Sequence, residues 1–254
     1  HHNPKQIVMK STALFISTLI LFFSIPTHAQ WGTKIKGNGN VVEQTRELTS
    51  YDEISISGNS NVILVRGSEG EITLKAEENL LDHIEVSVKN DMLKIKNKGR
   101  IELIPSKGKN ILITIPIHQV SKLSLNGSGE VEGNNLTLHG NKIKLQVNGS
   151  GDMEVNVKTA DVRAAINGSG DINISGETDY FEAIVTGSGD IDGYELFSNI
   201  CEGKVIGSGD IKFYARQKLD AKIIGSGYIK INESVVKIEK KIVGSGAIKK
   251  IRIN

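Results

Sequence analysis

Apolar and polar residues alternate with a period of two through most of this chain. Residues 142–147 (KIKLQV), for example, place an aliphatic side chain at every second position. Such alternation is typical of β-strands that bury one face and expose the other. Only residues 77–83 (EENLLDH) have a composition suited to a helical turn. The pattern therefore predicts an all-β chain.

The tripeptide Gly-Ser-Gly interrupts this strand pattern seven times in the second half of the chain. The interval from one copy to the next is nearly constant, at about 19 residues. A period of this length indicates one structural unit that is repeated and stacked. The first glycines of the seven copies are Gly127, Gly149, Gly168, Gly187, Gly207, Gly225 and Gly244.

Two apolar positions accompany every copy of the tripeptide. One lies two residues before its first glycine and the other four residues after it, and all fourteen residues are apolar. Each unit is therefore interpreted as a strand, a Gly-Ser-Gly corner and a second strand. Glycine lets one backbone approach another closely, which suits a corner that stacks coil upon coil. The predicted fold is a parallel β-helix, or β-solenoid, with coils of about 19 residues and Gly-Ser-Gly corners.

An up-and-down antiparallel sheet is the alternative, because Asn-Gly favours hairpins and Asn precedes the first three copies. Thr, Ile, Ile and Val precede the later copies, so the tripeptide is kept while its neighbour changes, which favours a stacked corner. Upstream, residues 37–41 and 58–62 repeat the corner-and-strand pattern at a similar interval. We expect an irregular β half over residues 30–118 and regular solenoid repeats over residues 119–254.

Residues 1–29 have the composition of a secretory signal peptide. Lys5 and Lys10 precede an apolar stretch at residues 13–25, and small residues precede a cleavage site between Ala29 and Gln30. A retained membrane anchor is the alternative, and residues 1–8, before Met9, are assigned no role. Export to the periplasm, the outer-membrane surface or the extracellular space is the expectation. The single cysteine, Cys201, is expected to be a small buried residue.

Charge is balanced overall but unevenly distributed. The chain has 31 basic and 29 acidic residues, and removing the two lysines of the signal peptide leaves it formally neutral. Nucleic acid is therefore not an expected partner. Residues 126–202 carry a net charge of −9, whereas residues 203–254 carry +8. Head-to-tail self-association or contact with anionic envelope polymers would use this asymmetry, and a solvated charged face is the simpler alternative.

The residue that follows the tripeptide is the main candidate for a site. It is acidic in five copies, and stacking the coils would place these carboxylates about 5 Å apart, where they repel by roughly 0.8 kcal/mol in water. Either a bound Ca²⁺ offsets this repulsion or each carboxylate accepts backbone N–H groups at its corner. The known calcium-binding repeat is shorter and differently spaced, so we expect no cofactor. The candidate cation or ligand ladder consists of Asp152, Asp171, Asp190 and Asp210, after Glu130.

A polysaccharide-active enzyme is a further alternative, because parallel β-helices often host such activities. An enzyme needs a local cluster of acids and bases, whereas the acids here recur at repeat positions. His83, His118 and His139 lack metal-ligand spacing, and no row of aromatic residues is visible in the sequence. We therefore expect a non-catalytic protein that acts in adhesion or in envelope binding and scaffolding.

Four short segments, in their order along the chain, resemble the GIN-domain family. They are residues 51–58 (YDEISISG), residues 79–81 (NLL) before the strand at Ile84, residues 93–95 (LKI) and residues 123–129 (LSLNGSG). The resemblance implies an exported β-rich domain with parallel β-helix character, described as the head of bacterial auto-transporter adhesins. It brings no catalytic residues. We expect envelope polymers, glycans or other envelope proteins as partners.

Overall fold

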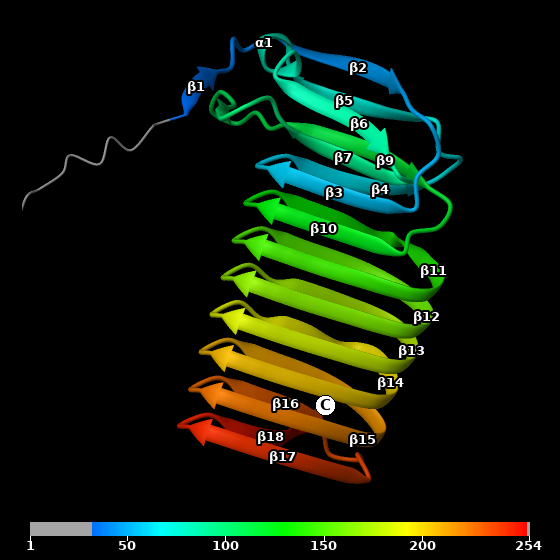
Figure 1. The fold of residues 1–254 in the computed structure, drawn as a ribbon, viewed down its shortest axis with the longest axis vertical. Helices are drawn as coiled ribbons and strands as arrows, with labels where there is room; N and C mark the ends of the chain where they lie inside the picture. Colours follow the sequence, from blue (N-terminus) through cyan, green and yellow to red (C-terminus); the bar gives the residue numbers. More distant parts are fainter. Residues whose placement is uncertain (1–31, 253–254) are drawn as a thin grey trace, which may run out of the picture. The chain divides into compact units, whose positions relative to one another are not determined.

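The computed structural model describes residues 32–252, which fold as one unit (Figure 1). The predicted signal peptide and the cleavage site at Ala29 and Gln30 lie outside the described residues. Among residues 32–252, none of the helical structure is long and apolar enough to span a bilayer.

The described residues form strands and one four-residue helix, α1 (Glu78–Leu81), which lies in the predicted stretch 77–83. The strands of the first half are β1 (Thr33–Lys36), β2 (Val41–Glu47), β3 (Glu53–Gly58), β4 (Asn61–Arg66), β5 (Glu71–Glu77), β6 (Ile84–Lys89), β7 (Met92–Asn97), β8 (Ile101–Ile104), β9 (Leu112–Ile117) and β10 (Lys122–Gly127). The strands of the second half are β11 (Glu130–Gly149), β12 (Asp152–Gly168), β13 (Ile172–Gly187), β14 (Ile191–Gly207), β15 (Asp210–Gly225), β16 (Tyr228–Asn232), β17 (Lys237–Gly244) and β18 (Ala247–Ile251).

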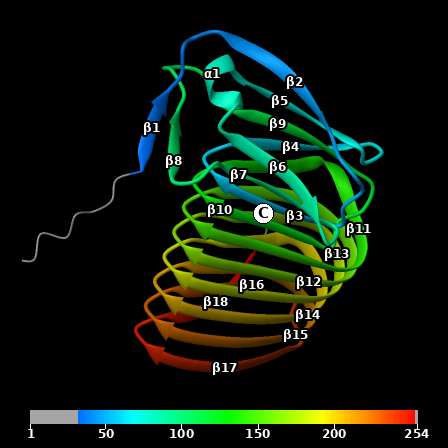
Figure 2. The same cartoon turned by 45° about the horizontal axis from the view of Figure 1, so that its top comes forward.

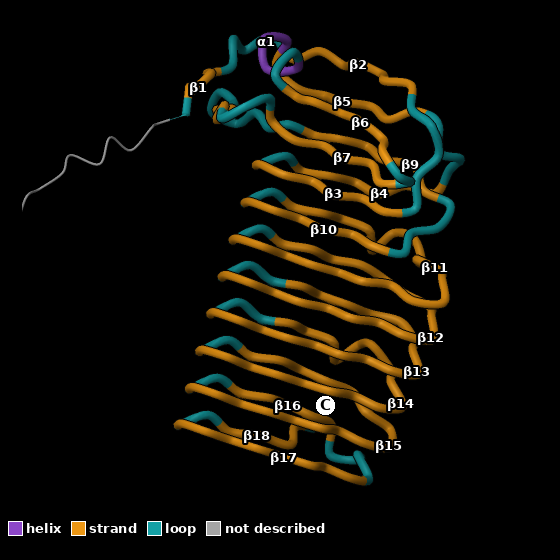
Figure 3. Tube along the Cα trace, viewed as in Figure 1, coloured by secondary structure: helices purple, strands orange, loops and turns teal. Residues whose placement is uncertain are grey.

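The second half is a stack of parallel coils, as predicted. Each of the long strands β11 to β15 runs from one corner to the next and pairs in parallel with the strands before and after it. The seven corner glycines are register partners from coil to coil, so the corners line up along one edge of the stack (Figures 1 and 3). The β-solenoid is thus confirmed, and the antiparallel alternative is wrong.

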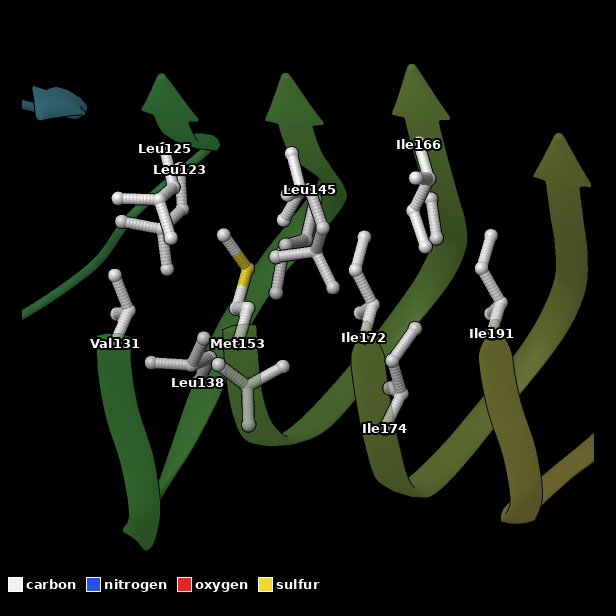
Figure 4. Packing of buried hydrophobic residues seen from close by; sticks show 14 of the residues in the cluster. Leu123, Leu125, Val131, Leu138, Leu145, Met153, Ile166, Ile172, Ile174 and Ile191 are labelled. Carbon is white, nitrogen blue, oxygen red and sulfur yellow. The ribbon is translucent and has the colours of Figure 1, made fainter. Parts of the chain in front are cut away.

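The two apolar positions that flank each corner form two columns inside the stack. In six of the seven coils both residues are at most 1% exposed, and neighbouring coils bring them into contact (Figure 4). Burying a Val, Ile or Leu side chain stabilises a fold by about 1.5–3 kcal/mol, so these columns supply much of the driving force for stacking. Further along the core, Phe181 and Phe213 pack edge to face with ring centroids 5.2 Å apart.

The N-terminal end of the stack is closed by antiparallel pairs (Figure 2). β2 pairs with β5 and β6 pairs with β7, each in antiparallel register. Below them, β3 and β4 form a degenerate coil, because Gly58 is the register partner of Gly127 and has a φ of +120°. The pattern at residues 37–41 makes no such corner, because β1 pairs with β8 and β2 runs antiparallel to β5.

A buried carboxylate fixes the connection between β1 and β2. Glu77 accepts hydrogen bonds from the Ser106 hydroxyl at 2.6 Å and the Ser106 amide at 2.8 Å, and it also accepts the Gly39 amide. These bonds, above all that from the Ser106 hydroxyl, hold the pKa of Glu77 below its usual range. The side chain therefore ties the chain after β1 to the loop after β8.

The last coil, which β17 and β18 form, carries lysines where the preceding coils carry core residues. Lys240 is the register partner of buried Ala221, and Lys250 is the register partner of buried Ile231. The Lys250 ammonium donates a hydrogen bond to the Glu233 carbonyl at 3.2 Å. Charged residues at inward positions of an edge prevent further strands from pairing with it. The final coil therefore has the character of a capping repeat.

A side chain at a corner glycine is expected to destabilise the stack severely. A Cβ at Gly187, whose φ is +128°, would lie 2.2 Å from the Gly168 carbonyl oxygen. Gly187→Ala should therefore lower the free energy of unfolding in urea by about 3 kcal/mol or more. Ser188→Ala at the exposed centre of the same corner is the control and should change it by less than about 0.5 kcal/mol. Equal stability of the two variants would contradict close stacking at the corner.

Removing the two inward lysines is expected to make the last coil self-associate. Lys240→Ala combined with Lys250→Ile restores the residues of the preceding coils, and sedimentation velocity should then show concentration-dependent oligomers. Lys222→Ala combined with Lys241→Ala removes the same charge from outward positions and should leave sedimentation unchanged.

Running the unaltered chain at low and high salt in the same experiment tests the predicted head-to-tail pairing, which requires oligomers that dissociate at high salt.

Candidate functional site

The predicted aspartate ladder is a chain of side-chain to backbone hydrogen bonds. The N–H of Asp171 donates to Asp152 Oδ1 at 3.1 Å, and that of Asp190 donates to Asp171 Oδ1 at 3.0 Å. The Asp210 N–H continues the ladder to Asp190 Oδ1 at 2.8 Å, and the Tyr228 N–H ends it on Asp210 Oδ1 at 2.9 Å. Each carboxylate thus satisfies a backbone donor of the following coil.

Two lysines compensate the negative charge near the C-terminal end of the ladder. Lys230 pairs with Asp210 Oδ2 at 2.8 Å, and Lys212 pairs with Asp192. Within residues 32–252, no three His, Cys, Asp or Glu side chains are grouped to hold a metal ion. Binding of Ca²⁺ by the ladder stays a prediction. The hydrogen bonds of the ladder form without a metal ion.

Beside the ladder, β14 departs from the regular repeat. Its register against β15 passes from Gly193 opposite Phe213 to Phe197 opposite Tyr214, so three extra residues bulge from β14. Bulges re-aim side chains and are frequent next to functional sites. Here the bulged residues include Tyr194 and Glu195, which line a depression on the outer surface.

Three aromatic side chains form a ridge at this bulge. The Tyr194 and Tyr214 rings pack edge to face with centroids 6.1 Å apart, and Phe197 packs against Tyr214 with centroids 4.9 Å apart. Phe197 is 39% exposed, which is unusual for so large an apolar side chain in this fold. The two tyrosines are half-buried. We call Tyr194, Tyr214 and Phe197 the aromatic ridge.

A groove lies on the ladder side of the aromatic ridge. It consists of a depression of about 420 Å³ and an adjoining one of about 310 Å³ that share Asn173, Asp192 and Lys212 in their walls. The larger is also lined by Glu154, Ser175, Tyr194, Glu195 and Ile251, and the smaller by Asp171, Asp190, Asp210 and Lys230. Six carboxylates therefore face two lysines, and the groove is net acidic. Its size is within the range of small-ligand sites.

A second depression lies on the far side of the aromatic ridge. It has a volume of about 310 Å³, and Phe197 forms one of its walls. Its charges are balanced, since Lys158 and Arg216 lie among its walls together with Glu177 and Asp179. The ridge thus separates an acidic groove from a neutral depression.

The sequence predicts that the aspartates stack in one column, and they do. It does not predict the aromatic ridge. Tyr194 and Tyr214 belong to successive coils, and each stands seven residues after the first glycine of its corner. Stacking makes them neighbours, which no local pattern indicates. The interval from Gly187 to Gly207 is longer than the next one, from Gly207 to Gly225, and this difference is the signal of the irregular coil. Cys201 is fully buried, as expected, and burial raises the pKa of its thiol to about 12.

Fold and site together define a parallel β-solenoid with a ligand-sized groove on its outer surface. Over residues 50–234 the chain matches the family described as "Putative auto-transporter adhesin, head GIN domain", and it belongs to that family. No curated protein matches the chain in sequence.

Solved structures of similar fold include proteins from Bacteroides and Parabacteroides species. A "putative adhesin" from Bacteroides fragilis has a TM-score of 0.78 and 22% identity, covering 85% of this chain and 100% of that one. A "putative adhesin" from Parabacteroides merdae has a TM-score of 0.69 and 19% identity over 87% and 100% of the two chains. A "Putative lipid binding protein" from Parabacteroides distasonis has a TM-score of 0.67 and 25% identity over 86% and 100%.

Removing one acceptor from the aspartate ladder is expected to lower the free energy of unfolding. The loss is expected to come from the missing hydrogen bond and not from the missing charge. Asp190→Ala leaves the Asp210 N–H without its partner and should lower the free energy of unfolding by about 1 kcal/mol. Asp190→Asn keeps the Oδ1 acceptor and should cost less than half as much. Adding Ca²⁺ should leave the melting temperature of all three proteins unchanged. A Ca²⁺-dependent rise that Asp190→Asn abolishes would instead establish the calcium alternative.

Proposed function

We propose that this chain is a non-catalytic binding protein of the bacterial envelope that acts in adhesion through the groove and the aromatic ridge. The observation that carries this proposal is the bulge in β14, because aromatic and charged side chains gather beside it. Membership of a family described as adhesin heads supports the same function. Location outside the cytoplasm rests on the predicted signal peptide and on this family.

Four of the six carboxylates of the groove have fixed partners, which supports binding rather than catalysis. Asp171 and Asp190 accept backbone hydrogen bonds, and Asp192 and Asp210 form ion pairs with lysines. A hydrolytic or lyase site needs an acid and a base that are both available to the substrate. The fixed partners of these four side chains suit the recognition of polar groups instead.

The relative described as lipid-binding suggests a second class of ligand. The groove does not favour an acyl chain, because six carboxylates and two lysines lie among its lining residues. Lipid vesicles are therefore included in the test below as a competing probe.

A binding experiment with a blocked groove tests the proposed function. Fluorescently labelled residues 30–254 should bind intact Bacteroides fragilis cells saturably. Asn173→Trp fills the groove from an exposed position whose side chain makes no hydrogen bond in the structure, and it should weaken binding about tenfold or more. Thr186→Trp, at an exposed outward position of the same strand, is the matched control and should bind like the unaltered chain.

Two results would overturn the proposed function. The first is an absence of saturable binding to cells, and the second is equal binding by the Asn173→Trp and Thr186→Trp variants. Competition by neutral phospholipid vesicles that removes all cell binding would assign the ligand to the lipid class.

A further inference from the structure

We infer that the groove, the aromatic ridge and the second depression form one elongated site for a neutral polysaccharide chain. This inference rests on the proposed binding function and specifies its ligand class. The three parts are contiguous, because Tyr194 lines the groove, Phe197 lines the second depression and Tyr214 contacts both rings.

The site extends along the strands as well as across successive coils. Its charged lining residues stand from three to eleven residues after the first glycine of their corners, as do Asp171, just before β13, and Asp179, within β13. At about 3.3 Å per residue this path is about 26 Å long. Such a length exceeds that of a single sugar and suits several consecutive residues of an extended polymer.

The chemistry of the walls matches the two faces of a sugar ring. Aromatic rings offer apolar surface to the C–H face of a pyranose, and the exposed side of Phe197 and the half-buried tyrosines provide this surface. Hydroxyl groups need acceptors and donors held in fixed positions. The ion pairs Lys212–Asp192, Lys230–Asp210 and Lys158–Glu177 hold such groups on both sides of the ridge.

The charge of the site favours neutral polysaccharides over anionic ones. With six carboxylates against two lysines in the groove, a sulfated or uronic-acid polymer would meet repulsion. The second depression is balanced and gives such a polymer no compensating attraction. A neutral polysaccharide meets no charge repulsion in the groove or in the second depression.

Another depression of the described surface has no aromatic ridge beside it. It is larger, at about 490 Å³, and is lined by residues of β4, of the bulge in β11 and of β12. Its walls include Arg66, Leu136 and Asn156 but no aromatic side chain. Size alone therefore does not mark the site, and the combination of aromatic ridge and fixed polar groups does.

Affinity electrophoresis and calorimetry with defined polymers test this inference. The probes are dextran, mannan, xylan and galactan as neutral chains, with dextran sulfate and polygalacturonate as anionic ones. At least one neutral polymer should bind residues 30–254, and dextran sulfate should not compete with it. Tyr194→Ala and Phe197→Ala should each weaken binding about tenfold or more. Tyr180→Ala, which removes an outward tyrosine of the neighbouring coil that hydrogen-bonds Glu202, is the matched control and should bind normally.

Each variant should first be shown to keep the far-ultraviolet spectrum and melting temperature of the unaltered chain. Asp192→Asn, which removes the ion pair with Lys212 without removing an aromatic side chain, is the third variant and should also weaken binding. Failure of all four neutral polymers to bind, tighter binding of an anionic polymer, or unchanged affinity of the Tyr194→Ala variant would overturn the inference. Binding of poly-lysine in place of neutral polymers would assign the site to cationic peptides.

The outcome separates this inference from the proposed function. A protein that binds cells but no neutral polymer retains its adhesive role and loses the polysaccharide site. A protein that binds a neutral polymer through Tyr194 but does not bind cells retains the site and loses the role in adhesion.

Discussion

Close approach of one backbone to the next at the glycine corners is the constraint on which the structure depends. At Gly189 a Cβ would lie 2.1 Å from the Gly170 carbonyl oxygen, and the same contact recurs from coil to coil. No residue with a side chain fits there, so each corner must lie directly over the one before. The register of every strand that leaves a corner is thereby fixed. The two apolar positions fall into columns because their distance from the corner never changes.

The same register turns single polar residues into ladders. Asn148 donates to Asn126 Oδ1 at 2.8 Å, and Asn167 donates to Asn148 Oδ1 at 2.9 Å, just before the corners, while the aspartates form their ladder just after them. Each residue supplies a hydrogen-bond partner for the equivalent residue of the next coil. Where the asparagine column gives way to Ile224 and Val243, which are 37% and 54% exposed, the surface becomes apolar instead.

The sequence predicts those parts of the molecule that repeat and misses those that do not. The period, the corner and both apolar columns are visible in it because each coil meets only its neighbours. The closure of the N-terminal end is not, since β2 and β5 pair through contacts between residues as distant as Val41 and Glu77. The sequence does not predict the aromatic ridge either, for a related reason. The ridge depends on a bulge that changes which residues of β14 and β15 meet, and alternation alone does not reveal a bulge.

One wall of the groove comes from the end of the described chain. Ile251 lines the groove, and its carbonyl accepts a hydrogen bond from the Tyr194 hydroxyl at 3.4 Å. Among residues 32–252, its strand, β18, pairs with β16 alone. Terminal strands of stacked folds detach more often than internal ones. The accessibility of the groove is therefore coupled to the fraying of β18, and a ligand that contacts Ile251 would slow that local opening while it stays bound.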